Sequence, residues 1–563
     1  MIGSPTFCRL LIRKTYDLAL RLTKIGTSPL PLLLNRAHAR NALGHFDEAL
    51  LDAKIIIKNE PDNEKALFRS ARALYGLRRY DEAYATVTKV VTLNPSSAAA
   101  KQDLKRCEQR LKEQKGDYDY GSMLREANEK NPKADMDRAS FLGPVEVRQC
   151  AVKEHGRGLF ATRDVQAGEE LLIEKAFMAA FPVPDKGTFK DDFSYGEDGT
   201  MRLGEGFWTL KENIAENLLS RLDNNPSLMK EFASLYPGPN AKEEVDPKLG
   251  HPELTLDMIN FRIMYNSFAF PVFSHLMHKL VARAHDDQRR KTPAHCMGVW
   301  INASFVNHSC YPNVRRSFLG DMMIFRARQD IPANTELFIE YAGSCDDEKD
   351  RENGLEKYGF QCQCSICKSQ RNTSAESLKK RKQIKQKLVD SFENMAGTDL
   401  EQCFRLLGEL DDTYEHPASQ EPRTAFVVPC MDLIYACVHG EMWYPVVKLG
   451  LIMLTALGFS INVTAKKFEI TKWGFGIDEV VACLADMWTA FGRVEPGIVD
   501  DVENCVRKAY RMMAGEEVSF AQAYGMCQPE IPKPEDPDME TLVARLNMGL
   551  PTPRSGIKGQ CLE

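Results

Sequence analysis

The sequence contains no apolar run long enough to cross a membrane. Its longest, Leu449 to Val463, covers about 15 residues and includes glycine, threonine and serine, whereas a membrane helix needs roughly 20 apolar residues. Met1 to Lys14 holds only a short apolar stretch with Arg9 and Arg13 in or beside it, so we expect no signal peptide. These absences predict an intracellular protein, of the nucleus or the cytoplasm, with no membrane partner.

A strong net charge is also missing. The formal net charge is −6 over 563 residues, and the pI is near 6.1. A chain that binds nucleic acid through its general surface charge is usually basic, so we expect no direct nucleic-acid partner. The hydrophobic share of 43% is that of a globular protein. The length exceeds what one core supports, so roughly two to four domains are expected.

Cysteine is present but unevenly placed. The 16 cysteines of a chain expected in a reducing compartment should be thiols or metal ligands. None occurs between Cys150 and Cys296, whereas Cys362, Cys364 and Cys367 form a CxCxxC cluster. Three cysteines so close together are unusual as buried apolar residues, and with one distant cysteine they would make a four-sulfur zinc set. Others lack ligand spacing and are expected to be buried thiols, including Cys403, Cys430, Cys437 and Cys483.

A repeat occupies the first part of the chain. Two alanines, an aromatic residue and a proline recur 34 positions later, which is the tetratricopeptide (TPR) period. Small residues let paired helices cross closely, aromatic residues fill the gap between them, and the proline ends the second helix. The pairs are Ala37 and Ala71, Phe46 and Tyr80, Ala49 and Ala83, and Pro61 and Pro95. We predict TPR repeats over residues 1–111, with Tyr16 to Leu20 left from an earlier repeat.

The pattern changes several times after the repeats. Residues 112–141 are polar and charged and are predicted to be a linker. From Val145, short β-branched pieces broken by glycine predict small, irregular sheets. Residues 181–258 are rich in proline, glycine and aspartate, with one helix expected near Lys211 to Leu235. After Cys367 the pattern becomes helical, and one buried helix face is predicted to contain Met431, Ile434, Tyr435 and Val438.

Five short motifs then follow one another over roughly 225 residues, an ordered set that is far more specific than any one of them. They are Gly156 to Phe160, Asn266 to Phe268, Asn307 to Asn313, Ile339 to Tyr341, and Tyr358 to Phe360 leading into the cysteine cluster. In this order they resemble the SET-domain protein lysine methyltransferases, and are most similar to the SET and MYND-domain group. The gap between Cys150 and Cys296 departs from that group, because it leaves no ligands for the MYND zinc finger.

The resemblance implies an α+β protein. Its centre is a SET-domain β fold with a pseudoknot, in which the Asn307 and Tyr341 segments meet, followed by a post-SET zinc site. All-α, TPR-like regions flank this centre on both sides. The expected domains are TPR repeats at 1–111, a linker at 112–141, a SET domain at 142–343 with an insert at 181–258, a post-SET zinc segment at 344–370, a C-terminal helical domain at 371–530, and a disordered tail at 531–563.

The resemblance also implies an activity: methyl transfer from S-adenosylmethionine to a lysine of a histone or another protein. Tyr341 aligns with the catalytic tyrosine, and a neutral phenol can orient the amine lone pair without becoming charged. Zinc is implied at Cys310, Cys362, Cys364 and Cys367, with Cys345 as a spare ligand. The cofactor-binding residues implied are Gly156, Arg157, Gly158, Asn266, Asn307, His308, Tyr341 and Phe360.

Each of these residues also has an ordinary structural interpretation. A GxG motif alone is typical of a turn between strands, and a tyrosine at the end of an apolar strand is usually half-buried packing. Asn307 and His308 could be a turn asparagine and a core histidine, and Phe360 could be core packing. His308 is not assigned as a general base. The rival interpretation of the whole chain is a non-catalytic TPR/SET scaffold or a chaperone-linked adaptor.

The repeats are expected to bind a peptide or protein partner. Asn35, Lys65 and Arg69 stand where some TPR domains hold the C-terminal carboxylates of heat-shock chaperones, although Lys-x-x-x-Arg is also common on solvated helix faces. The basic run Lys379 to Lys382, with Lys385 and Lys387, is either a nuclear signal or one face of a charged helix that buries Ile384 and Leu388.

Overall fold

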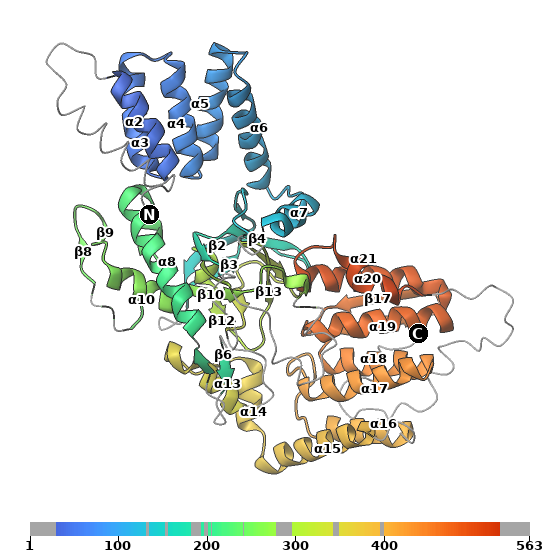
Figure 1. Cartoon of the computed structure of the whole chain (residues 1–563). Helices are drawn as coiled ribbons and strands as arrows, with labels where there is room; N and C mark the ends of the chain where they lie inside the picture. Colours follow the sequence, from blue (N-terminus) through green and yellow to red (C-terminus); the bar gives the residue numbers. More distant parts are fainter. Residues whose placement is uncertain are drawn as a thin grey trace.

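The chain forms a central set of small β-sheets with helices on both sides (Figure 1). The expected arrangement of sheets between two helical regions is therefore confirmed. Within the described ranges, no helix has the length and apolar character that a bilayer crossing requires. This computed structural model describes residues 30–130, 134–151, 156–181, 193–195, 201–203, 205–239, 241, 243–276, 278, 296–341, 348–393, 399–464 and 466–529.

The N-terminal region is a row of antiparallel helices, each packed on the next. They are α2 (Leu30–Leu43), α3 (Phe46–Asn59), α4 (Glu64–Gly76), α5 (Tyr80–Leu93) and α6 (Ala98–Glu113). Helices α3 and α5 begin at Phe46 and Tyr80, the aromatic pair of the repeat. Ala37, Ala49, Ala71 and Ala83 are all at most 4% exposed, as expected for small residues where helices cross. Tyr16 to Leu20 lies outside the described residues.

The segment predicted to be a polar linker is folded against the sheets. Helix α7 (Tyr120–Lys130) buries Met123 and Leu124 in a cluster with Leu319 and Met322 of the central sheet. The Tyr120 hydroxyl donates to Glu170 Oε1 at 2.7 Å. Residues 112–141 thus join the repeats to the sheets as packed structure, because their apolar residues, few as they are, share one helix face.

The central region consists of short strands. The largest sheet has the order β1 (Phe141–Leu142), β4 (Glu170–Lys175), β14 (Met322–Ala327) and β13 (Val314–Leu319). A second has the order β10 (Ser267–Phe270), β11 (Cys296–Val299) and β5 (Met178–Ala180). Between them lies a core in which Trp300 packs against Phe270 and Phe318. Two-stranded pairs complete the region: β2 (Val145–Gln149) with β3 (Arg157–Ala161), β6 (Phe193–Tyr195) with β7 (Met201–Leu203), β8 (Val245–Asp246) with β9 (His251–Pro252), and β12 (Asn307–His308) with β15 (Phe338–Ile339).

The single helix predicted near Lys211 to Leu235 is wrong in its extent. Helix α8 runs from Glu205 to Asn224, and a separate short helix, α9, covers Met229–Ala233. The break follows from Pro226, which cannot donate the backbone hydrogen bond that would continue α8. A third helix, α10 (Leu256–Asn266), leads into β10.

Asn225, at this break, joins the insert to the repeats. Its Oδ1 accepts the backbone N–H groups of Phe46 and Asp47 at 2.7 and 3.3 Å, so it caps α3 from another part of the chain. Its Nδ2 donates to the carbonyls of Gly44 and Arg221, and the side chain is 2% exposed. All four bonds are made at one buried carboxamide, which holds the first repeat against α8.

The C-terminal region is a stack of helices (Figure 1). After α13 (Glu348–Leu355) and α14 (Ser365–Asn372) come α15 (Ala375–Glu393), α16 (Leu400–Asp411), α17 (Val427–His439), α18 (Trp443–Ala456), α19 (Asp478–Val494), α20 (Val499–Ala514) and α21 (Phe520–Tyr524). The basic run Lys379 to Lys382 lies within α15, which buries Ile384 and Leu388.

Two details of this region differ from the prediction. A hairpin, β16 (Ser460–Thr464) and β17 (Lys467–Lys472), interrupts the helices, and it buries Ile461, Val463 and Phe468 by strand alternation. On α17, Tyr435 is 46% exposed instead of buried. The buried face is rotated toward Leu433 and the two cysteines Cys430 and Cys437, whose thiols pack like small apolar groups.

Asp478 fastens this helical stack to the sheets. At the start of α19, its carboxylate accepts Arg315 Nη2 of β13 at 2.9 and 3.2 Å. It also lies 2.8 Å from His278 Nδ1, while His278 Nε2 lies 2.8 Å from the Tyr524 hydroxyl. Burial alone would raise the pKa of Asp478, but Arg315 and then His278 hold it well below its usual range.

We expect Asp478→Asn to weaken this attachment by about 3 kcal/mol, because the change leaves Arg315 without its buried counter-charge. The folded-state pKa of Asp478 is depressed, so its contribution is present above an unfolded pKa of about 4 and is lost as the pH falls below it. Thermal unfolding of the full chain should therefore show a lower midpoint at pH 7. The difference in midpoint between the variant and the wild-type protein should become smaller at acidic pH. Asp500→Asn, on the exposed start of α20, is the control.

Candidate functional site

Two segments about thirty residues apart in the chain pair side by side at the centre of the molecule. Strands β12 and β15 are parallel, with Asn307 opposite Phe338 and His308 opposite Ile339. The Ser309 N–H continues the ladder to the Ile339 carbonyl at 3.0 Å. This pairing brings the Asn307 segment to Tyr341, as the resemblance implies.

Tyr341 is fixed at this crossing by three groups. Its hydroxyl donates to the Val306 carbonyl at 2.7 Å, and its backbone N–H donates to His308 Nδ1 at 3.0 Å. Its ring lies 4.9 Å from that of Tyr358, measured between centroids. Burial raises the pKa of Tyr341 above its usual value, so the phenol stays neutral at physiological pH. A neutral hydroxyl in one orientation is thereby presented beside an aromatic wall.

His308 connects Tyr341 to the cysteines. Because Nδ1 accepts the Tyr341 N–H, the ring proton of a neutral His308 is on Nε2, which lies 3.3 Å from Cys310 Sγ. Both ring nitrogens are therefore occupied by structural contacts.

The four cysteines of the predicted zinc set come together. The Sγ atoms of Cys310, Cys362, Cys364 and Cys367 all lie within 4.8 Å of one another, and Cys310 and Cys367 are 3.6 Å apart. Zinc–sulfur bonds of about 2.3 Å in a tetrahedron would place the sulfurs roughly 3.8 Å apart, so the group fits a zinc ion. The Arg351 side chain is 5% exposed beside Cys367 and adds positive charge next to the thiols. Cys345, the spare candidate, lies outside the described residues.

The glycine loop has two different geometries. Gly156 has a φ of +64°, a backbone conformation that favours glycine, and no described atom lies within 4 Å of where its Cβ would be. A Cβ on Gly158 would lie 2.6 Å from Glu336 Oε1 and 2.9 Å from Cys150 Sγ. With respect to the described residues, Gly156 therefore has open space for a close ligand, whereas Gly158 makes room for protein side chains.

Glu336, which no motif of the sequence indicated, holds two side chains beside this loop. Its Oε1 accepts Asn307 Nδ2 at 2.7 Å and the Cys150 thiol at 3.3 Å. The Asn307 side chain is thus held toward the loop of Gly158. The only signal in the sequence was an acidic residue five positions before Tyr341, which has no distinctive spacing.

The remaining predicted residues surround the turn at Ala303–Phe305 that precedes β12. Arg157 donates to the Ser234 carbonyl and lies over the Phe305 ring, 4.7 Å from its centroid. Asn266 is 4% exposed, and its amide group donates to the carbonyls of Tyr236 and Arg262. The backbone carbonyl of Asn266 accepts a hydrogen bond from the Ser304 hydroxyl at 3.2 Å. Both residues therefore support the turn.

Two further residues, Phe360 and Glu174, contact the segment around β12. Phe360 is 39% exposed and lies 6.0 Å from His308, ring to ring, so it forms an open edge of the aromatic wall. Glu174, also not identified from the sequence, accepts the N–H groups of Asn302 and Ala303 at 2.9 Å each. Burial raises the pKa of Glu174 to about 7. The carboxyl group thus anchors the start of the turn.

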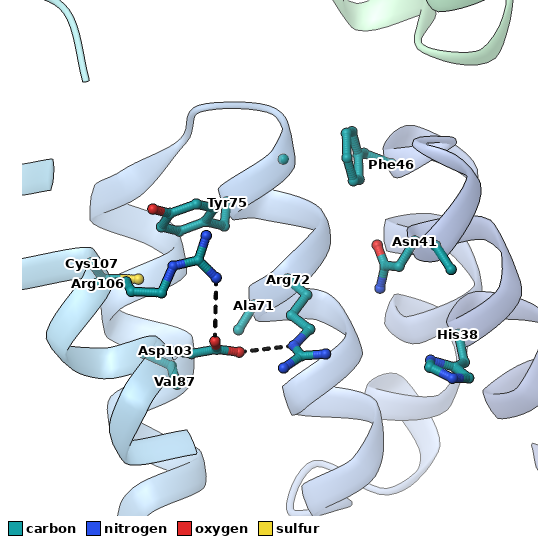
Figure 2. A pocket seen from close by; sticks show the side chains of 12 residues that line it. His38, Asn41, Phe46, Ala71, Arg72, Tyr75, Val87, Asp103, Arg106 and Cys107 are labelled. Carbon is teal, nitrogen blue, oxygen red and sulfur yellow. Dashed lines mark hydrogen bonds and ion pairs between the residues drawn. The ribbon is translucent and has the colours of Figure 1, made fainter. Parts of the chain in front are cut away.

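A second candidate site is a cavity of about 330 Å³ between the N-terminal helices. Figure 2 shows its polar wall, where Asp103 is bonded to both Arg72 and Arg106, facing Asn41 and His38 across the cavity. Asn41 Nδ2 donates to the Arg69 carbonyl at 2.9 Å, and no described residue donates to its buried Oδ1. The predicted clamp residues Asn35, Lys65 and Arg69 are not among the side chains that line this cavity.

The SET domain family model matches residues 156–342, which include four of the five motifs and the paired strands β12 and β15. A protein of Gibberella zeae named "Methyltransferase" is 29% identical over 504 residues, covering 87% of this chain and 68% of that protein. Mouse "Histone-lysine N-methyltransferase SMYD3" is 31% identical over 100 residues, which are 18% of this chain and 23% of that one. "N-lysine methyltransferase SMYD2-A" of Xenopus laevis is 32% identical over 78 residues, or 14% and 18%.

The matches differ in how much of each chain they cover. The likeness to the fungal protein extends over most of the chain, while the likeness to the SMYD proteins covers less than a quarter of their length. Residues 156–342 therefore match the SET domain, and the chain is similar to proteins named as methyltransferases, among them members of the SET and MYND-domain group.

Proposed function

We propose that this protein is an S-adenosylmethionine-dependent protein-lysine N-methyltransferase acting on a histone or another protein. The observation that carries the proposal is the Tyr341 hydroxyl, held by the Val306 carbonyl where β12 and β15 meet. A non-catalytic scaffold has no need for a partly buried phenol oriented in this way beside an aromatic wall and a complete cysteine set.

The chemistry is an in-line displacement. S-adenosylmethionine supplies an activated methyl group, and the protein has to align a neutral lysine amine with it at about 3 Å. Gly156 and the backbone of Asn307 and His308 would hold the methyl donor, while Phe268, Tyr358 and Phe360 would exclude water from the lysine. Desolvation lowers the pKa of the amine and favours its neutral form. Tyr341 would accept a hydrogen bond from this amine and direct its lone pair.

We propose zinc as the ion held by the four cysteines. The metal would tie Cys310, next to β12, to the segment of Tyr358 and Phe360. Its contribution is structural, because four sulfur ligands leave no open position on the ion. The neighbouring His308 N–H and Arg351 would stabilise the negative charge of the thiolates.

The decisive experiment incubates purified full-length protein with S-adenosylmethionine carrying a labelled methyl group, and with mixed histones or cell extract. We expect label on lysine in at least one protein. Neither transfer nor binding of the methyl donor would reject the enzyme and favour the scaffold. Binding of the donor without transfer would direct the search to other protein substrates.

The cavity in the N-terminal helices supports a second role for the same chain. We propose that these helices are TPR repeats that recruit the protein substrate or a partner as an extended peptide, the C-terminus of a heat-shock chaperone being one candidate. Such a peptide could donate a backbone N–H to Asn41 Oδ1 and accept from Arg72.

Arg72→Gln should slow methylation of an intact substrate protein several-fold, an effect of about 1 kcal/mol, while leaving the rate on a short peptide unchanged. The substrate is the protein labelled in extract, and the peptide contains its modified lysine. Arg79→Gln, which removes a similar exposed ion pair with Glu82, is the matched control. Equal slowing of protein and peptide would contradict recruitment through the cavity.

A further inference from the structure

Three arginines lie near Tyr341 at the end of β13 and β14. Arg315 reaches Asp478 of the C-terminal helices, whereas Arg316, the next residue of the strand, lies on the opposite face over the Phe268 ring. Arg315 and Arg316 are consecutive on β13, and Arg328 follows the end of β14. Because β13 and β14 pair with Val314 opposite Ala327, Arg328 returns to the same end of the sheet, where its N–H donates to the Asn313 carbonyl at 2.8 Å.

The described surroundings of this group contain less negative than positive charge. Two carboxylates act on it, Glu340 and Asp478. Asp478 is already engaged by Arg315 and His278. Glu340, the residue before Tyr341, is left to balance the other two guanidinium groups. Among the residues that the structure describes, the group has three cations against two anions, and therefore an excess of one positive charge.

Hydrogen-bond donors are in excess as well. Arg328 is only 4% exposed, yet no described residue accepts from its Nε or Nη1. The same holds for Arg315 Nε among the residues that the structure describes. Burial, followed by the charge of Arg315, lowers the pKa of Arg328 to about 10. Buried cationic donors without acceptors are costly, and an anion bound beside them would remove that cost.

The group is next to the position proposed for the reacting lysine. The Arg316 guanidinium lies 5.6 Å from the centroid of the Phe268 ring, and it interacts electrostatically with Tyr358 and Tyr341. The Arg315 side chain is 24% exposed, so the group can be reached from solvent. An anion bound here would be within a few residues of the lysine on an extended chain, which advances about 3.4 Å per residue.

We infer that Arg315, Arg316 and Arg328 form a binding site for a carboxylate of the substrate, so that the enzyme prefers lysines with an aspartate or glutamate close by in the sequence. This inference rests on the proposed methyl transfer. Guanidinium groups suit the role because they make paired, charge-assisted hydrogen bonds with carboxylates.

The test uses peptides with a central lysine in a background of alanine, glycine and serine. One glutamate is scanned through the flanking positions, and each peptide has a partner with glutamine at the same place. For at least one position, we expect wild-type kcat/KM to be about tenfold higher with glutamate, as one charge-assisted contact allows. Arg328→Leu and Arg316→Gln should each reduce this ratio to below about twofold while leaving rates on the glutamine peptides largely unchanged.

Arg148→Gln, an exposed change on β2, should keep the preference. The inference is overturned by equal wild-type rates on every glutamate and glutamine pair, or by a preference that survives in both arginine variants. If both arginine variants bind the methyl donor more weakly but still prefer the glutamate peptides, the three arginines bind the donor and not a substrate carboxylate. If no peptide is methylated, the proposed function is decided separately by the labelling of histones and extract, and anisotropy of the same labelled peptides decides whether the site still selects glutamate over glutamine.

Discussion

Tyr341→Phe should reduce methyl transfer by about 100-fold or more while the protein stays folded and still binds the methyl donor. The magnitude is that of removing one oriented polar group at a reacting centre. The phenylalanine ring keeps the contacts with Tyr358 and His308, and only the bond from the hydroxyl to the Val306 carbonyl is lost, at a cost of about 1 kcal/mol.

Donor binding is measured by calorimetry and transfer by single-turnover labelling, so that the two effects are separated. Tyr435→Phe removes a hydroxyl from an exposed tyrosine on α17 and should change neither quantity. A Tyr341→Phe protein with normal transfer would show that the hydroxyl has no part in the reaction. Its role would then be limited to fixing the turn before β12.

Cys364→Ser should abolish zinc binding and, with it, methyl transfer. A four-sulfur site contributes on the order of 10 kcal/mol or more to the folding of the residues that it joins, so losing one ligand should loosen the segment of Tyr358 and Phe360. The zinc content found by elemental analysis should fall from one ion per chain to none. Hydrogen exchange should rise in residues 348–372 and stay unchanged in α2 to α5.

Cys505→Ser, which changes a partly buried thiol on α20, should retain both zinc and activity. Freshly purified, active protein without zinc would refute the metal assignment. Zinc retained in Cys364→Ser would instead mean that another ligand replaces this cysteine.

Local spacing predicted the features that depend on a few nearby residues. The 34-residue repeat predicted paired helices in the N-terminal region, because helix crossings require small residues at fixed positions. The cysteine cluster indicated a metal site because sulfur ligands need close, regular spacing. Cys310, more than fifty residues away, could be added only through the family resemblance, and the structure places it 3.6 Å from Cys367.

Features that depend on long-range packing could not be predicted in this way. Glu336 can accept a hydrogen bond from Asn307 only because the chain leading into β15 lies beside the glycine loop. Arg328 comes to the same end of the sheet as Arg315 only because β13 and β14 pair in one register. The hairpin at β16 and β17 alternates over too few residues to stand out from a helical pattern. Tyr435 fits the spacing of a buried helix face on α17, but Cys430 and Cys437 lie on the face that is buried in the structure.

The cap that Asn225 provides has a consequence for communication between the two candidate sites. Phe46, whose N–H the cap accepts, also lines the cavity between the N-terminal helices, and its ring sits against Gly76 with no room for a side chain there. A peptide that moved Phe46 would change the hydrogen bonds at the end of α8, and α8 packs on β11 and β5 of the SET domain. Any such coupling is reciprocal: a partner that altered affinity for the methyl donor would itself be bound more or less tightly, by the same factor, when the donor is present. Cutting the chain at residue 111 would break this link and leave the Asn225 side chain with only its bond to the Arg221 carbonyl. A truncated protein would therefore report on lost coupling as well as on lost recruitment.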